Sequence, residues 1–128
     1  MAKHLKSKIE DIELLISSPA TRAQRTMRFF ASAYPNADII KDDRIYEAFA
    51  NDLMSVIHDL SDEYQSAMMF GHNPSFTSFF NKFSKNELDN LPTCGIFSLS
   101  SHASTWRDVK IDNTVVDFLI YPKMFKRS

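Results

Sequence analysis

Short apolar runs alternate with amphipathic stretches along most of the chain. Apolar runs at 13–17, 66–70, 95–99 and 115–121 predict strands, and 38–41 is expected to be an edge strand. Apolar residues three and four positions apart predict helices between them, and residues 3–10 look like the end of another helix. The predicted inward faces are Ala20, Ala23, Met27, Phe30, Ala31 and Tyr34, then Leu53, Met54, Ile57 and Leu60, then Phe76, Phe79, Phe80 and Phe83.

This alternation of strands and helices predicts an α/β fold, a three-layer α/β/α sandwich around a mostly parallel mixed sheet. The last two strands are joined by a loop that holds Trp106 and has no obvious helix, so one of them is expected to be antiparallel. Local signals suggest where helices begin. Ser18 is expected to cap the first long helix with Pro19 at its first position, and Asn51 is expected to cap the next.

Two strand-to-helix joints, Ile16 to Arg22 and Met69 to Ser75, match each other in pattern. Each carries one chemically capable side chain, Arg22 or His72, to the end of a strand, the edge at which open α/β sheets bind ligands. A guanidinium and an imidazole at such an edge suit a phosphate. Alternatives remain, because Arg22 is also one of several arginines on a solvated helix face and His72 could simply bond a loop carbonyl.

Composition narrows the setting of the protein. The 128 residues suit a single domain spanning 1–128, and 15 basic against 16 acidic residues give a net charge of −1. No global field therefore recruits nucleic acid or an anionic membrane. A single cysteine, Cys94, fits a reducing compartment, and neither a secretion signal nor a membrane-length apolar run is found. We expect a cytoplasmic protein.

Several kinds of site are excluded by missing residues. Only two glycines, Gly71 and Gly95, are present, whereas Walker and dinucleotide-binding loops need several. Cys94 has Ser100 rather than an arginine six residues on, which argues against a cysteine-phosphatase loop, and no serine has the glycines of a hydrolase elbow. The histidines and Cys94 lack metal-ligand spacing, so no metal or cofactor is expected.

A polar cluster at Asp42, Asp43, Arg44 and Glu47 precedes the second long helix. A carboxylate beside a bound phosphate could protonate a leaving group, and Glu47 is the candidate. The alternative is a solvated loop with a weak local ion pair of Arg44.

Four segments, taken in order, resemble the SixA-type branch of the histidine phosphatase superfamily, also called phosphoglycerate-mutase-like: LISSPATRAQRT at 15–26, RIYEA at 44–48, FGHNP at 70–74 and LPTCG at 91–95. The resemblance covers nearly the whole chain. It implies the sandwich fold and phosphoryl transfer through a covalent phosphohistidine. The implied substrate is a phosphohistidine in a signalling protein or a small phosphoester.

The same resemblance assigns roles to three residues. Arg22 matches the pocket arginine, His72 the second histidine of the site, and Glu47 a proton donor. The family opens with a strand ending in Arg-His-Gly or Arg-His-Ala, whose histidine is the nucleophile, and no such pair occurs here. His4 follows Lys3 and no strand, so it is not assigned this role. We therefore expect that the first family strand is missing and that these 128 residues are inactive.

Three explanations of the missing nucleophile stay open. The chain is a fragment of an ordinary phosphatase, which we favour, or a shortened relative that binds phosphate or a phosphorylated protein without turnover, or a rearranged enzyme in which His72 itself attacks phosphorus. A fragment is expected to self-associate through exposed strand edges. A purely structural or interaction protein is a further alternative, with the Phe76–Phe83 helix as its contact surface.

Overall fold

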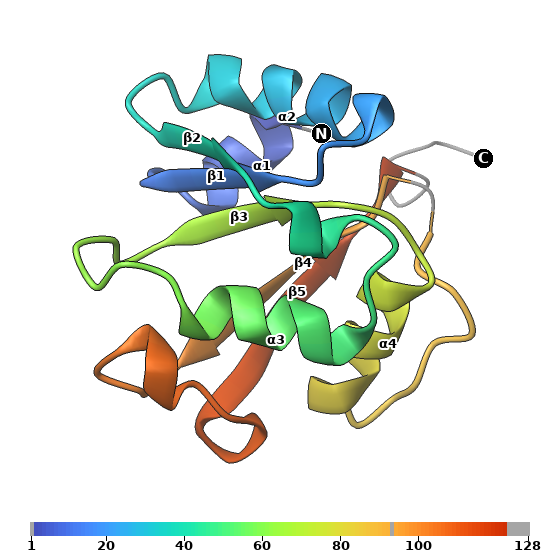
Figure 1. The fold of residues 1–128 in the computed structure, drawn as a ribbon. Coiled ribbons are helices and arrows are strands. Elements are labelled where there is room, and N and C mark those ends of the chain that lie inside the picture. The colour runs from blue at the N-terminus through green and yellow to red at the C-terminus, as the bar shows by residue number, and fades with distance from the viewer. Residues whose placement is uncertain (1, 93, 123–128) are drawn as a thin grey trace.

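The structure is a computed structural model that describes residues 2–92 and 94–122, so Thr93 of the LPTCG segment lies outside the described residues. Helices and strands alternate as far as α4, and a β-hairpin follows (Figure 1). The elements are α1 (Ala2–Lys8), β1 (Leu14–Ser17), α2 (Thr21–Ala33), β2 (Asp38–Lys41), η1 (Asp43–Ile45), α3 (Ala50–His58), β3 (Ala67–Phe70), α4 (Ser75–Phe83), β4 (Ile96–Ser101), η2 (Trp106–Asp108), η3 (Ile111–Asn113) and β5 (Thr114–Ile120).

Strands form the middle layer, with α1 and α2 on one face and α3 and α4 on the other (Figure 1). Strand β1 serves both faces because successive side chains of a strand point to opposite sides. Leu15 enters the core beneath α1 and α2, and Leu14 and Ile16 enter the core against α3 and α4. We call these the α1–α2 core and the α3–α4 core.

Three parallel strands form the first sheet, in the order β2-β1-β3. Strands β4 and β5 form an antiparallel pair with a register shift between Ser98 and Leu99. The predicted α/β class is confirmed, including a three-stranded parallel sheet flanked by helices and an antiparallel strand. The periodicity did not indicate that the strands would fall into two sheets.

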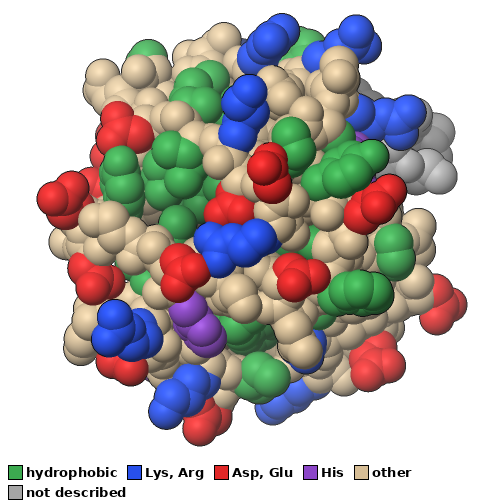
Figure 2. Space-filling model, in the orientation of Figure 1, with side chains coloured by type: hydrophobic (Ala, Val, Ile, Leu, Met, Phe, Trp, Pro, Cys, Tyr) green, Lys and Arg blue, Asp and Glu red, His purple; other side chains and the backbone are tan. Residues whose placement is uncertain are grey.

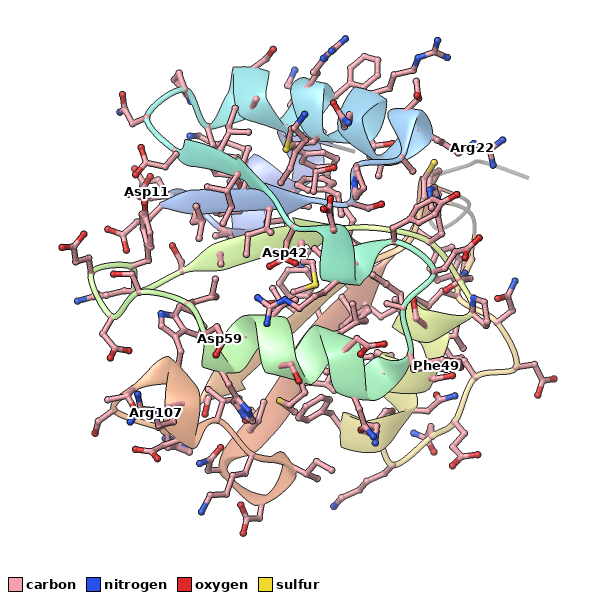
Figure 3. The ribbon with its side chains drawn as sticks, in the orientation of Figure 1. Asp11, Arg22, Asp42, Phe49, Asp59 and Arg107 are labelled. Atoms are coloured by element: carbon pink, nitrogen blue, oxygen red, sulfur yellow. The ribbon has the colours of Figure 1, made fainter. Side chains whose placement is uncertain are left out.

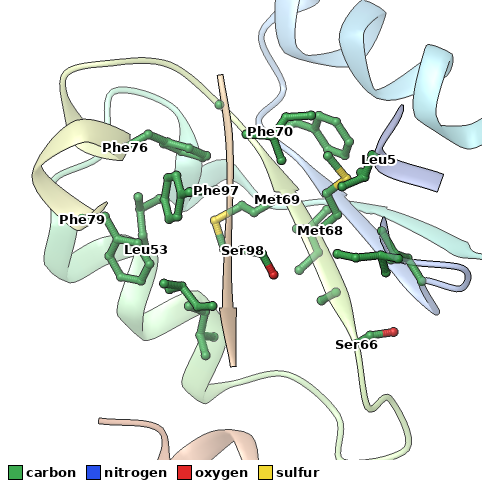
Figure 4. Close-up of a pocket in the computed structure, with 18 of the residues that line it drawn as sticks. Leu5, Leu53, Ser66, Met68, Met69, Phe70, Phe76, Phe79, Phe97 and Ser98 are labelled. Atoms are coloured by element: carbon green, nitrogen blue, oxygen red, sulfur yellow. The ribbon is translucent and has the colours of Figure 1, made fainter. Parts of the chain in front are cut away.

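The hairpin nevertheless lies in the same layer as the parallel sheet. Ile96 and Phe118 pack against the α1–α2 core, and Phe97 and Leu99 pack against the α3–α4 core. Strands β3 and β4 do not pair. They line opposite sides of a cavity of about 1860 Å³, which we call the slot (Figure 4).

One end of the slot is bridged by the loop between the hairpin strands. The indole Nε1–H of Trp106 donates to the carbonyl oxygen of Tyr64 at 2.9 Å, and the backbone N–H of Trp106 donates to Asp62 Oδ1 at 3.1 Å. These bonds attach the hairpin to the segment that leads into β3. The hairpin is therefore held beside the sheet without a hydrogen-bonded ladder between β3 and β4.

Both predicted helix caps are wrong. Helix α2 begins at Thr21, and the Ser18 hydroxyl accepts a bond from Ala20 N–H at 3.2 Å, which forms a turn ahead of the helix. Helix α3 begins at Ala50, before the predicted cap Asn51, and Asp52 Oδ2 accepts from the N–H of Phe49 at 2.8 Å. A carboxylate three residues ahead thus caps this helix in place of a side chain at its start.

The phenylalanines of α4 belong to the core. Phe79 and Phe80 are buried, the Phe79 ring meets Phe83 edge to face, and the Phe80 ring meets Phe97 in the same way. This packing argues against the Phe76–Phe83 helix as a free contact surface. Over the described part of the chain, none of the helices is long and apolar enough to cross a membrane.

Candidate functional site

The two strand-to-helix joints lie side by side because their strands are parallel neighbours in register. Ser17 is opposite Phe70, and just beyond them the N–H of Ser18 donates to the carbonyl oxygen of Phe70 at 2.9 Å. The chain then turns into α2 on one side and into α4 on the other. Arg22 and His72 therefore start from the same edge, and both line the slot.

Arg22 stands in the first turn of α2, exposed, and projects from the end of the molecule at which that helix begins (Figure 3). Helical side chains lean toward the N-terminus, so its guanidinium can reach a group over the helix start. The first N–H groups of the helix also favour an anion there. Ser17 and Ser18 beneath the turn are fully buried, and the Ser17 hydroxyl donates to the carbonyl of Ser18 at 2.7 Å.

His72 lies in a loop that is fixed by its own hydrogen bonds. The Ser75 hydroxyl donates to the carbonyl oxygen of His72 at 2.8 Å, and Asn73 Oδ1 accepts from both the N–H and the hydroxyl of Thr77 at 3.1 and 2.8 Å. Thr77 in turn accepts from the N–H of Leu91 at 2.9 Å. The half-buried His72 is thus carried by a backbone whose position is set by α4, which suits a group that must hold a ligand in a fixed geometry.

Gly71 permits a close approach that the sequence pattern did not indicate. A Cβ at this position would lie 2.6 Å from a ring carbon of Phe76 and 2.7 Å from a methyl carbon of Ile45. The absence of a side chain lets η1 pack over the end of β3, and the N–H of Asp42 bonds the carbonyl of Ser17 at 3.0 Å. The segment after β2 is therefore at the same edge as the two joints.

Glu47, the predicted proton donor, follows this segment. It is exposed, has a left-handed φ of 50°, and is not among the residues that line the slot. Its neighbour Arg44 is engaged elsewhere, with ion pairs of 2.7 Å to Asp42 and 2.6 Å to Asp59 (Figure 3). The hydrogen bond from Arg44 holds the pKa of Asp42 below its usual range, and both carboxylates raise the pKa of Arg44. Arg44 is therefore satisfied within the chain.

Three residues on one side of α2 also line the slot, and the sequence analysis did not group them together. Arg22, Thr26 and Phe29 all line it, and their spacing of four and three residues is the signal that could have placed them together. Across the described residues, no group of three or more His, Cys, Asp and Glu side chains is arranged to hold a metal ion. His58, away from these joints, has its Nε2 2.9 Å from the carbonyl oxygen of Val109.

No protein-family model and no curated protein matches the chain. Solved structures do. A protein from Agrobacterium tumefaciens, provisionally named phosphohistidine phosphatase SixA, superposes with a TM-score of 0.76 at 24% identity, covering 94% of this chain and 75% of that one. This chain has a SixA-like fold. A second provisionally named SixA, from Nakamurella multipartitia, has a TM-score of 0.75 at 13% identity, covering 94% of this chain and 77% of that one.

The SixA-like fold agrees with the α/β sandwich fold that the four sequence segments implied. At these identities the likeness concerns the fold. The function has to be argued from the site.

Proposed function

We propose that this chain is the phosphoryl-binding part of a SixA-type phosphohistidine phosphatase, with Arg22 and His72 as its phosphate contacts. The observation that carries the proposal is that these two side chains arise from neighbouring strand ends and line one cavity. A guanidinium binds two phosphoryl oxygens at once, and an imidazole N–H donates to a third. The resemblance to SixA-type proteins supports a phosphohistidine-bearing protein as the substrate.

Turnover in this scheme needs a nucleophilic histidine. Its imidazole nitrogen forms a P–N bond as the P–N bond of the substrate breaks, the leaving imidazole takes up a proton, and water then releases inorganic phosphate. Glu47 is the candidate donor of that proton. Because no Arg-His pair occurs in the 128 residues, we expect this chain to bind the phosphoryl group without hydrolysing it. A strand seated in the slot would bring a nucleophile to the edge where Arg22 and His72 lie.

The second candidate is a phosphate- or phosphoprotein-binding module that has no catalytic role. The missing Arg-His pair favours it equally. The two candidates differ in what happens when a catalytic strand is restored, since a dedicated binding module gains nothing from it.

The deciding experiment is hydrolysis of a phosphohistidine peptide by three proteins: this chain, its His72→Ala variant, and a version extended at its N-terminus by a strand ending in Arg-His-Gly. We expect turnover only from the extended version. If the 128 residues alone are active and His72→Ala abolishes the activity, His72 is the nucleophile and our assignment is wrong. If no version is active, the binding module is favoured.

Binding is measured separately with vanadate, which mimics the phosphoryl group. A ligand at 100 times its Kd stabilises the folded state by about 2.7 kcal/mol, which raises the melting temperature by several degrees in a protein of this size. We expect Arg22→Ala to abolish most of that rise. Arg107→Ala, an exposed arginine near the far end of the molecule, is the matched control (Figure 3). A rise that Arg22→Ala leaves intact contradicts the proposed site.

A further inference from the structure

Charge is distributed unevenly over the two faces of the sandwich. Helices α1 and α2 contain six of the fifteen basic residues and none of the sixteen acidic ones, although the chain as a whole is close to neutral. Lys and Arg side chains gather along the upper margin of the molecule, over α2 (Figure 2). The six residues are Lys3, Lys6, Lys8, Arg22, Arg25 and Arg28.

Two of the lysines have roles within the fold. Lys6 Nζ donates to the carbonyl oxygen of Ala33 at 2.8 Å and lies over the ring of Tyr34, and Lys8 Nζ lies over the ring of Phe118. The arginines of α2 are different. All three are exposed, and the ion pairs of the described residues involve Arg44 alone.

The placement of these arginines does not serve the stability of α2. A helix is stabilised by acidic residues in its first turn and basic residues in its last, and α2 has neither. Instead Arg22 stands in the first turn, and Arg25 and Arg28 follow at intervals that place like charges next to one another. An arrangement that opposes helix stability points to a role in binding.

An exposed aromatic ring accompanies the charges. Phe29 is 74% exposed and lines the slot together with Arg22 and Thr26. Arginine and aromatic residues, including phenylalanine, are enriched at protein interfaces relative to the rest of the surface. We call Arg22, Arg25, Thr26, Arg28 and Phe29 the α2 docking face.

We propose that the α2 docking face binds an acidic protein surface next to the phosphohistidine that Arg22 and His72 receive. The inference rests on the proposed function for its phosphoryl group. From Arg22 to Arg28 is about 9 Å along the helix axis, so a phosphate held at Arg22 cannot also reach Arg28. A small phosphoester uses only the first of these residues. A protein with carboxylates flanking its phosphohistidine engages the whole face, and Phe29 anchors its apolar contact.

Two peptides of equal length test the proposal, each carrying one stable phosphonate analogue of phosphohistidine. Asp and Glu flank the analogue in one peptide, and Asn and Gln replace them in the other. We expect the acidic peptide to bind this chain roughly tenfold more tightly at low ionic strength. Because the Debye length shortens as salt is added, the advantage is expected to shrink toward 1 M salt.

Variants locate the effect. Arg25→Glu/Arg28→Glu is expected to abolish the preference for the acidic peptide, and Phe29→Ala to weaken both peptides. The matched control is Lys82→Glu/Lys85→Glu, which makes the same change in net charge at exposed positions on and just after α4. All these positions are on the surface, so the variants should fold, and circular dichroism checks that they do.

Each outcome separates this inference from the proposed function. Equal binding of the two peptides, lost on Arg22→Ala, overturns the docking face and leaves the phosphate site standing. Binding of neither peptide, with no response to vanadate, overturns the proposed function and the inference with it. Tighter binding of a single-stranded oligonucleotide or of phosphatidylserine vesicles, dependent on Arg25 and Arg28, would show that the face serves another anionic partner and overturns the protein assignment.

Discussion

Strands β1 and β3 are parallel neighbours of equal length, each with helices on both faces, yet they are buried to different degrees. All four residues of β1 are at most 1% exposed, whereas Ala67, Met68 and Met69 of β3 are half-buried. Leu15 and Met68 are opposite each other in the ladder and face the same core, so the difference does not come from the helical layers. It comes from the edges, because β1 pairs on both sides and β3 pairs only with β1.

The comparison shows that helical cover alone does not seal a strand in a sandwich. The carbonyl of Phe70 accepts from β1, so the alternation of the ladder directs the N–H and C=O groups of Ala67 and Met69 toward the slot. Polar backbone groups need partners, and along this edge water or another strand must supply them. Strand β4, on the other side of the slot, is likewise half-buried from Ile96 to Leu99.

The largest effect on stability is expected from truncating Leu15 and Met68, which lie opposite each other in the ladder. Leu15→Ala removes a fully buried side chain and should lower the free energy of unfolding by about 3 kcal/mol. Met68→Ala should lower it by roughly half as much, because water already reaches part of that side chain and the space left opens into the slot. Urea denaturation of both variants and of the unmodified chain measures the difference.

The other face of the same strands repeats the experiment. Ile16 and Met69 are also opposite each other, and both meet the α3–α4 core. Ile16→Ala should again cost more than Met69→Ala. Equal losses within both pairs would mean that β3 is sealed as well as β1, which would contradict an open slot.

Much of the fold could be predicted from the sequence because the burial that makes a strand or helix is periodic. Asp38–Lys41 is an edge strand as predicted, and Ala23, Met27 and Phe30 form the buried side of α2. Helix caps were less predictable. Ser18 and Asn51 both have suitable side chains, but the local backbone starts α2 after Ser18 and α3 before Asn51. The division of the sheet is not visible in periodicity, because the apolar runs of β3 and β1 look alike whether or not both edges are paired.

Some features of the candidate site could likewise be predicted from the sequence, and others could not. That Arg22 and His72 start from one edge of the sheet follows from two local patterns and the rule that parallel strands end at one edge of a sheet. The approach of Ile45 to Gly71 joins residues 26 positions apart, and no pattern in the neighbouring sequence predicts it. The hydrogen bond from Trp106 to Tyr64 is equally unpredictable from local sequence, because it depends on how the hairpin docks.

Hydrogen exchange sharpens the comparison at single amides. The N–H groups of Met68 and Phe70 point toward β1, and that of Met69 points toward the slot. We expect the Met69 amide to exchange on the order of 100-fold faster than its two neighbours, since exchange follows the local opening free energy. A strand or peptide that fills the slot should slow Met69 selectively. Equal protection of the three amides in the unmodified chain would contradict an unpaired edge.

The smallest expected effect concerns the β2 side of the layer, where Arg44 bridges Asp42 and Asp59. Because Arg44 lowers the pKa of Asp42 in the folded state, the ionised carboxylate stabilises the protein above its unfolded pKa of about 3.9, and this contribution is lost as the pH falls through the folded value. Arg44→Met should therefore reduce the free energy of unfolding near pH 7 by less than about 1 kcal/mol, as expected for exposed pairs. The deficit should narrow below about pH 4. The measurement is denaturation of both proteins across this pH range. If the loss of unfolding free energy in Arg44→Met persists unchanged at pH 2, packing of the Arg44 side chain, rather than its charge, stabilises this end of the sheet.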